Sequence, residues 1–325
     1  MEEKAQGGKA IDSELPSLVF LGTPEFAVPS LEKLVSADAS IRVVITQPDR
    51  PSGRGKRLRA SPVKVLAQAC GIPVYQPQRI KESEALEHIR AYGAECAAVV
   101  AYGQILPQAF LDAFPLGTLN VHASLLPDYR GAAPMQRCLL AGESRTGVTI
   151  MLLDAGMDTG PILSQRELPL KEDETFGGLH DKMAQVGADL LLETLKRWKA
   201  GRVVPIPQED PLATYAPPLL KAEGRLRWDA PAHQIVNAIR AFDPLPGAFG
   251  FFHGQRLKFF HAALLPWKGE GGAGEIVGCT ERGLAVLGGD GQGFVIGQMQ
   301  LEGQRRLAAA EFLRGHVMPV GSLLE

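Results

Sequence analysis

Three side chains in the middle of the chain have types and a spacing suited to chemistry: Asn120, His122 and Asp158. Asn120 and His122 lie two residues apart in the run TLNVH, which has the pattern of a strand end, and Asp158 follows in the loop DAGMDTGP. Because alternate residues of a strand project from the same face, the amide and the imidazole are expected to point together. The pattern predicts one site that holds an amide, an imidazole and a carboxylate.

Such a trio suits acyl transfer that proceeds without a covalent enzyme intermediate. Asn120 offers N–H donors to an oxyanion, and a protonated His122 adds a charged donor. Asp158 can hold the imidazole protonated or accept a proton from an attacking amine. Structural roles fit the spacing equally well: Asn120 in a turn, His122 as a partly buried histidine and Asp158 as a helix cap. The residues alone leave both interpretations open.

Strands must position these residues. A second strand-like run, 148–153, precedes Asp158. If it lies beside TLNVH in a parallel sheet, the loops after both strands meet over one crevice, where open α/β sheets bind ligands. The apolar run 96–102 also suits a parallel sheet covered on both faces. The first strand–helix–strand unit has only Gly22 where a dinucleotide site needs G-x-G-x-x-G, which disfavours an NAD-dependent enzyme.

The most basic segment is 48–64, PDRPSGRGKRLRASPVK, and its glycines and prolines predict a long flexible loop. Its cationic residues are Arg50, Arg54, Lys56, Arg57, Arg59 and Lys64. Most charge runs are solvated surface. A loop of this length in a compact domain is, however, usually functional or disordered.

The length of 325 residues predicts two domains. We expect a disordered tail at 1–15, an α/β domain with a mostly parallel sheet at 16–202, a Pro-rich linker at 203–221 and a smaller OB-like β-barrel domain at 222–325. The linker prediction rests on Pro205, Pro207, Pro211, Pro217 and Pro218. Short strands separated by glycines indicate the barrel.

Composition narrows the class of protein. The net charge of −2 gives no whole-chain basic signal, so any contact with nucleic acid must come from local patches. The four cysteines form no C-x-x-C pair, which indicates free thiols in a reducing compartment and no zinc site. No apolar run is long enough to span a membrane, and the first residues lack the apolar core of a signal peptide. We therefore expect a cytoplasmic protein without a bound metal.

The motifs NVHASLLPDYRGAAP and D-x-G-x-D-T-G-P resemble the signature of the folate-dependent formyltransferases, and Asn120, His122 and Asp158 match its catalytic positions. Three further runs, FLGTPEFAVPSL, VVITQPDRPSGRGK and IRAFDPLPGAF, resemble the members that act on methionyl-tRNA. The resemblance covers about 18–320. It implies a Rossmann-like formyltransferase domain and transfer of a formyl group from 10-formyltetrahydrofolate to the α-amino group of methionyl initiator tRNA. We expect the enzyme to be a monomer.

The resemblance also implies binding residues. The folate donor would contact the turn that contains Gly103, Ile105 and Leu106, largely through its backbone, and the four residues Ser124, Leu125, Leu126 and Pro127. The tRNA would contact the cationic residues of the 48–64 segment, with Arg54 foremost, and the C-terminal domain, including Arg240.

Two alternatives remain open. A formyltransferase acting on a small amine, such as glycinamide ribonucleotide or an aminosugar nucleotide, would keep Asn120, His122 and Asp158 but have no use for the basic segment. A non-catalytic RNA-binding module would use the basic segment and the barrel but leave the three polar residues without a role.

Overall fold

A computed structural model describes residues 14–52 and 57–325. Most of the tail expected at 1–15, and two of the predicted tRNA contacts, Arg54 and Lys56, lie outside the described residues. Within the expected tail, Leu15 is 3% exposed and packs in the core of the first domain. The folded domain therefore includes residues that we assigned to the tail.

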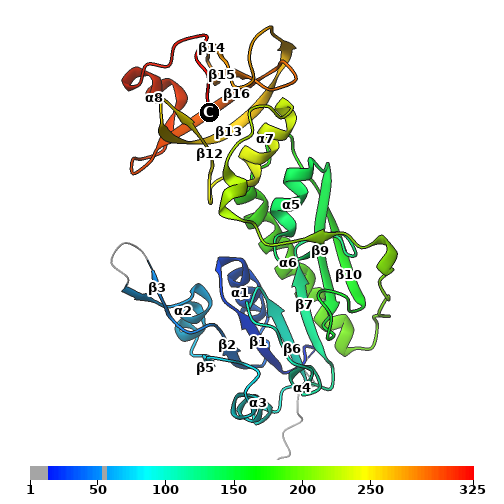
Figure 1. Cartoon of the computed structure of the whole chain (residues 1–325). Coiled ribbons are helices and arrows are strands. Elements are labelled where there is room, and N and C mark those ends of the chain that lie inside the picture. Colours follow the sequence, from blue (N-terminus) through cyan, green and yellow to red (C-terminus); the bar gives the residue numbers. More distant parts are fainter. Residues whose placement is uncertain (1–13, 53–56) are drawn as a thin grey trace, which may run out of the picture.

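The first domain is built on a seven-stranded sheet with the order β10-β9-β7-β6-β1-β2-β5 (Figure 1). Its parallel strands are β1 (Leu18–Gly22), β2 (Ile41–Ile45), β5 (Val74–Tyr75), β6 (Cys96–Val100) and β7 (Thr118–His122). Alternate residues of β1 enter two separate cores, Leu18 and Phe20 on one face and Val19 and Leu21 on the other. The continuous apolar strands are thus explained by burial on both faces, and the predicted mostly parallel sheet is confirmed.

Helices cover the two faces of this sheet. They are η1 (Glu25–Ala27), α1 (Val28–Ser36), α2 (Pro62–Ala69), α3 (Ser83–Arg90), α4 (Gln108–Leu111), α5 (Pro134–Ala141) and α6 (Phe176–Lys199). The longest, α6, is capped by the Thr175 hydroxyl and packs on α1 and β9 through buried residues such as Leu179, Met183 and Leu191. Its apolar stripe and cap explain why a helix forms there.

One expectation about the sheet was wrong. The strand after β7 is β9 (Arg145–Leu152), and it pairs with β7 antiparallel rather than parallel, while β10 (Ile162–Pro169) returns as a hairpin at the edge. The loop after β9 therefore starts at the amino end of β7, where Leu153 N–H donates to the Thr118 carbonyl over 2.8 Å. This loop must run back along β7 to bring its residues to the carboxyl end.

The basic segment is also more regular than expected. Its described parts include β3 (Arg50–Ser52) and β4 (Arg57–Arg59), which pair antiparallel with Arg50 opposite Arg59, and the first turn of α2. Cross-strand hydrogen bonds thus hold both ends of a segment that we expected to be an irregular loop.

The C-terminal part, for which we predicted an OB-like β-barrel, is an antiparallel β domain. Its sheet has the order β12-β13-β16-β15-β14 and is formed by β12 (Ala248–Phe252), β13 (Gln255–Lys268), β14 (Ile276–Thr280), β15 (Gly283–Leu287) and β16 (Gln292–Leu301), with β17 (Leu307–Ala308) paired to β16. The helices α7 (Ala232–Ala241) and α8 (Ala309–Gly315) share its core, which includes Trp228, Phe259 and Phe294.

The Pro-rich segment 203–221 is not a free tether, because it packs on the first domain. It contains η2 (Asp210–Leu212) and β11 (Tyr215–Ala216), is followed by η3 (Lys221–Gly224), and β11 pairs in parallel with β8 (Arg130–Gly131). Ile206 also exchanges backbone hydrogen bonds with Ile162 at the start of β10. Composition predicted a connection between domains, but these pairings make the segment part of the first domain's surface.

Direct contacts join the two domains. Gly177 N–H at the start of α6 donates to the Asp243 carbonyl over 2.9 Å, and the Arg240 guanidinium donates to the Glu172 carbonyl. The helices α5 and α7 pack side by side at the same junction (Figure 1). Among the described residues, no helix is long and apolar enough to cross a membrane.

Candidate active site

The polar trio lies beside a cavity of about 420 Å³. Asn120 and Asp158 line this cavity together with the turn 103–106, which includes Gly103, Ile105 and Leu106. Ile105 is 93% exposed and Met157 is 66% exposed, so apolar side chains flank an opening whose interior presents polar groups. A cavity of this composition suits a flat heteroaromatic ligand with a polar edge.

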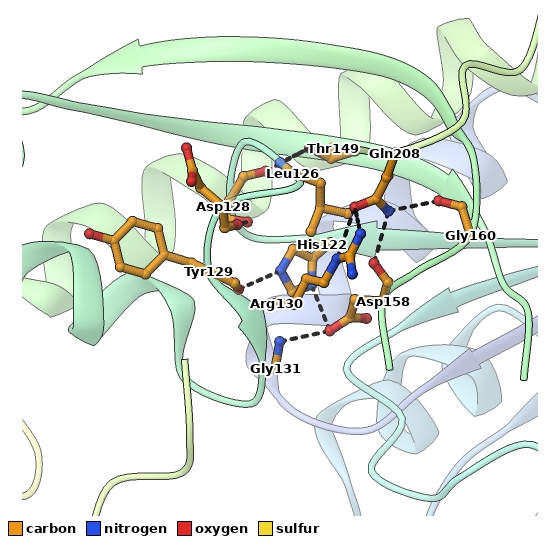
Figure 2. A network of polar contacts seen from close by, with 11 residues as sticks. His122, Leu126, Asp128, Tyr129, Arg130, Gly131, Thr149, Asp158, Gly160 and Gln208 are labelled. Carbon is orange, nitrogen blue, oxygen red and sulfur yellow. Dashed lines mark hydrogen bonds and ion pairs between the residues drawn. The ribbon is translucent and has the colours of Figure 1, made fainter. Parts of the chain in front are cut away.

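His122 stands next to the cavity and is held from both ring nitrogens (Figure 2). Nε2 donates to the Tyr129 carbonyl over 3.0 Å, and Nδ1 lies 3.6 Å from Oδ2 of Asp158. His122 is 6% exposed, so solvent has little access to the ring. With Nε2 engaged by a backbone carbonyl, Nδ1 is the nitrogen that can carry a second proton beside Asp158.

The carboxylate of Asp158 is oriented by the backbone of the neighbouring strand β8. Its Oδ2 accepts a hydrogen bond from Gly131 N–H over 2.8 Å and also faces His122. Residues 129 and 131 therefore position the imidazole and the carboxylate through backbone groups alone. An amide, a cationic imidazole and a carboxylate in this arrangement can stabilise an oxyanion and accept a proton from an amine.

Backbone strain is concentrated around the trio. Asp158 has φ of 55° and Tyr129 has φ of 59°, in the left-handed region that L-residues other than glycine seldom occupy. Ala101, which lines the same cavity, has φ of 48°. Each such residue costs of the order of 1–3 kcal/mol and persists only where its surroundings hold it. Strain of this kind is typical of sites whose geometry is set by function.

A second cavity of about 400 Å³ adjoins the first and shares Ala101, Tyr102 and Gly103 with it. Its rim carries two of the predicted tRNA contacts, Arg50 and Arg59, which face each other across the β3–β4 hairpin. The structure thus brings part of the basic segment next to the polar trio, and the wall 101–103 separates the two cavities.

The other predicted folate contacts lie elsewhere. Ser124 and Leu126 are 1% and 3% exposed, and the segment 124–127 does not line either cavity. The Ser124 hydroxyl donates to the Asp128 carbonyl, and Leu126 N–H donates to the Thr149 hydroxyl. In this structure the segment follows β7 and is tied to β9 through the Thr149 hydroxyl.

The side chains of two residues predicted to contact tRNA interact with other groups of the protein. Lys64 Nζ donates to both carboxylate oxygens of Asp49, over 2.9 and 2.7 Å, at the start of α2. Arg240 is 7% exposed and is held at the domain junction through the Glu172 carbonyl. Burial places Arg240 in the contact between the domains. Arg57 lies in β4, and its side chain is outside the described residues.

Sequence reasoning missed the residues that hold the loop of Asp158. Arg130 is 2% exposed, and its guanidinium donates to Gln208, which in turn donates to the backbone of the Asp158 loop (Figure 2). No local pattern marks Gln208, because it is far from the other members in sequence and sits in a Pro-rich segment. No group of three or more His, Cys, Asp or Glu in residues 14–52 and 57–325 is arranged to hold a metal ion.

Comparison with known proteins identifies the family that has this architecture. A family model described as formyl transferase matches residues 17–195, and one described as formyl transferase, C-terminal domain matches residues 218–317. The chain thus belongs to the formyl transferases, and its fold is theirs.

Among the formyl transferases, the chain belongs to the methionyl-tRNA formyltransferase family. It is 48% identical over 308 residues to the methionyl-tRNA formyltransferase of Syntrophus aciditrophicus, a match that covers 95% of this chain and 98% of that protein. The corresponding protein of Pelobacter propionicus is also 48% identical over 308 residues, which cover 95% of this chain and 96% of that protein.

Solved structures show the same fold at low identity. HypX from Aquifex aeolicus in complex with tetrahydrofolic acid matches with a TM-score of 0.64 and 18% identity, over 94% of this chain and 48% of that chain. An N-formyltransferase from Helicobacter canadensis in complex with folinic acid and dTDP-3-aminofucose matches with a TM-score of 0.64 and 19% identity, over 86% of this chain and 98% of that chain.

Proposed function

We propose that the protein transfers the formyl group of 10-formyltetrahydrofolate to the α-amino group of methionine esterified to initiator tRNA. The observation that carries this proposal is the grouping of Asn120, His122 and Asp158 at a cavity flanked by apolar side chains. The family membership supports the choice of acceptor, because the relatives that match nearly the whole chain are methionyl-tRNA formyltransferases.

In the proposed mechanism the neutral amine attacks the formyl carbon and forms a C–N bond. Asn120 N–H groups and protonated His122 Nδ1 stabilise the oxyanion that develops on the formyl oxygen. Asp158 supports the imidazolium and, through water, takes the proton from the new ammonium group. The bond to the folate nitrogen then breaks, and that nitrogen takes up the proton.

The two adjoining cavities suggest where each substrate binds. The donor would occupy the cavity lined by Asn120 and the turn 103–106, with its pteridine between the apolar side chains. The aminoacyl end would enter from the cavity rimmed by Arg50 and Arg59, where cations can hold phosphates of the tRNA. The shared wall 101–103 would then lie where the amine meets the formyl group.

The decisive experiment measures transfer of labelled formyl from 10-formyltetrahydrofolate to initiator methionyl-tRNA. Elongator methionyl-tRNA and glycinamide ribonucleotide serve as competing acceptors in parallel reactions. We expect selective labelling of the initiator species. Labelling of glycinamide ribonucleotide alone would contradict the tRNA role while keeping the chemistry, and absence of transfer to any acceptor would contradict the enzymatic role altogether.

We also propose that the protein acts as a monomer in the cytoplasm. Its four cysteines are all free thiols, which suits a reducing compartment. Light scattering coupled to gel filtration tests the oligomeric state, and a mass near 34.9 kDa is the expected result. A mass near twice that value would contradict it.

A further inference from the structure

Gln208 connects the Pro-rich segment 203–221 to the loop that carries Asp158 (Figure 2). Its Nε2 donates to the carbonyl of Asp158 over 2.8 Å and to the carbonyl of Gly160 over 2.7 Å. One side chain thus holds the backbone on both sides of Thr159. The contact bridges about fifty residues of sequence and reaches the backbone of a residue in the proposed catalytic trio.

Arg130 determines which way the Gln208 amide faces. Nε and a terminal nitrogen of the guanidinium donate to Oε1 of Gln208 over 3.0 and 2.9 Å, and the terminal nitrogen also pairs with Asp210 over 2.9 Å. A guanidinium only donates hydrogen bonds, so it selects the amide oxygen. The amide N–H groups must then face the two carbonyls, and every hydrogen-bonding position of the amide is used.

The loop held by Gln208 needs such support. Asp158 occupies the left-handed region at φ of 55°, which is unfavourable for a residue with a side chain. Gly160 lies so close to β9 that a Cβ there would meet the Leu152 carbonyl oxygen at 2.0 Å. Asp154 supports the other side of the loop through Gly156 N–H and the Thr159 hydroxyl. The Gln208 contacts act on the one turn that sets the direction of the Asp158 carboxylate.

Strand β8 and the residue before it, Tyr129, make the other contacts to the trio. Tyr129 offers its carbonyl to His122, Gly131 N–H donates to the Asp158 carboxylate, and Arg130 between them orients Gln208. Arg130 N–H itself donates to the Thr214 carbonyl in the segment 203–221. Three consecutive residues therefore couple that segment to both the imidazole and the carboxylate.

We propose that Gln208, oriented by Arg130, is a positioning residue that holds the Asp158 loop in its reactive geometry. This inference rests on the proposed function, and it assigns to the Pro-rich segment a part in turnover that its composition does not suggest. Gln208 touches neither substrate in this assignment. Its loss should therefore lower turnover and leave the affinities for folate and tRNA near their original values.

The test is Gln208→Glu, which preserves size but replaces two N–H donors by a carboxylate oxygen facing two carbonyls. We expect kcat to fall about 30-fold, since displacement of a reacting group by about 1 Å costs up to 10²-fold, with both KM values within about threefold. Turnover is normalised to the number of sites that bind tetrahydrofolate, so that a misfolded fraction is not counted. Glu209→Gln, an exposed neighbour, is the matched control and should keep the original kcat.

Amide hydrogen exchange provides a readout that does not depend on activity. Exchange at residues 156–161 should become at least about tenfold faster in Gln208→Glu and stay unchanged in Glu209→Gln, because the contacts that hold the loop are lost only in the first. If the original protein formylates no acceptor, the proposed function fails while this measurement still tests the positioning role.

Two results would overturn the inference. Unchanged kcat in Gln208→Glu would show that the loop does not need this contact for turnover. A fall in kcat without faster exchange at 156–161 would show that the effect of the substitution reaches the reaction by some other route.

Discussion

At the scale of single residues, the imidazole of His122 is positioned by one backbone carbonyl and one carboxylate. The Tyr129 carbonyl accepts from Nε2, so the protonation that matters for an oxyanion takes place at Nδ1, 3.6 Å from the Asp158 carboxylate. Removal of Asp158 would leave a nearly buried imidazole without a counter-charge. Asn120, like Asp158, lines the cavity itself.

Replacement of Asn120 by Ala removes an N–H donor aimed at the developing oxyanion. Loss of one such donor typically costs about 10²–10³ in turnover, so we expect kcat to fall in that range. Binding of tetrahydrofolate should remain within about threefold, because the turn 103–106 still lines the cavity. Steady-state formylation assays and equilibrium binding measure the two quantities. Turnover like that of the original protein would remove Asn120 from the catalytic trio.

At the scale of elements, the pairing of β8 with β11 is the feature that brings the segment 203–221 against the site. It depends on close approach at Gly131, which has φ of 123°. A Cβ at this position would meet the Ala216 carbonyl oxygen at 2.7 Å. Any side chain there must push β11 away from β8.

Gly131→Ala should therefore lower the free energy of unfolding by about 2 kcal/mol or more, because backbone strain and a clash with fixed backbone add together. Gly71→Ala is the matched control: Gly71 has φ of 69° but nothing within 4 Å of a Cβ, so it tests strain alone. Urea denaturation of both variants gives the comparison. Equal losses in the two would contradict a tight β8–β11 contact.

The β3–β4 hairpin allows a separate test of RNA binding. The double substitution of Arg50 and Arg59 by Gln should weaken tRNA binding. It should also reduce the steepness of log K against log salt concentration by about 1–2, because a protein that makes fewer phosphate contacts releases fewer counterions when it binds. Folate affinity should not change. Arg145 on β9 and Arg166 on β10, which lie outside the hairpin, serve as the charge-matched pair.

Filter binding of initiator tRNA over a range of salt concentrations measures the slopes. If the Arg145 and Arg166 pair reduced the slope as much as the hairpin pair, the effect would be one of total charge rather than of the hairpin. Loss of folate affinity in the hairpin variant would contradict the assignment of the two cavities to different substrates.

At the scale of the whole molecule, ion pairs and backbone contacts fix the C-terminal domain to the first. Asp243, 4% exposed, offers its carbonyl to Gly177 of the first domain, while its carboxylate pairs with Arg306 of its own domain over 2.7 Å. Arg137 on α5 donates to both carboxylate oxygens of Glu223, over 2.5 and 3.1 Å, and to the carbonyls of Pro217 and Pro218. The C-terminal end of the Pro-rich segment is thus also attached to the first domain.

The Glu223 contact predicts a pH dependence. Hydrogen bonding to Arg137 holds the pKa of Glu223 below its ordinary value of 4.5. A carboxyl whose pKa is lowered by folding stabilises the protein above the unfolded value and loses that contribution as the pH falls through the folded value. Glu223→Gln should therefore cost about 1 kcal/mol of unfolding free energy at pH 7, and the difference should disappear in acid well below pH 4.5.

Denaturation in urea at the two pH values tests this, with the exposed Glu281→Gln as control. A cost for Glu223→Gln that stays the same in acid would contradict the ion-pair origin of the effect. A cost of the same size in Glu281→Gln would indicate a general effect of net charge.

Much of the fold could be predicted because its signals are local. The strand β6 occurs where the apolar run 96–102 predicted it, and the helix α6 shows its burial through periodic apolar residues. The direction of β9 was not predictable in this way, since an apolar strand pairs equally well with either orientation of its neighbour. Asp158 reaches His122 although that expectation was wrong, because the loop after β9 runs back along β7.

The sequence by itself determined the chemical groups of the site and the family, because residue types and motif spacing are properties of the chain alone. The tertiary structure decided the rest: it buried Arg240 in the domain junction, buried Ser124 and Leu126, and paired Lys64 with Asp49. It also brought Gln208 to the backbone of Asp158. These contacts join residues distant in sequence, and their pairing depends on which surfaces meet once the two cores have formed.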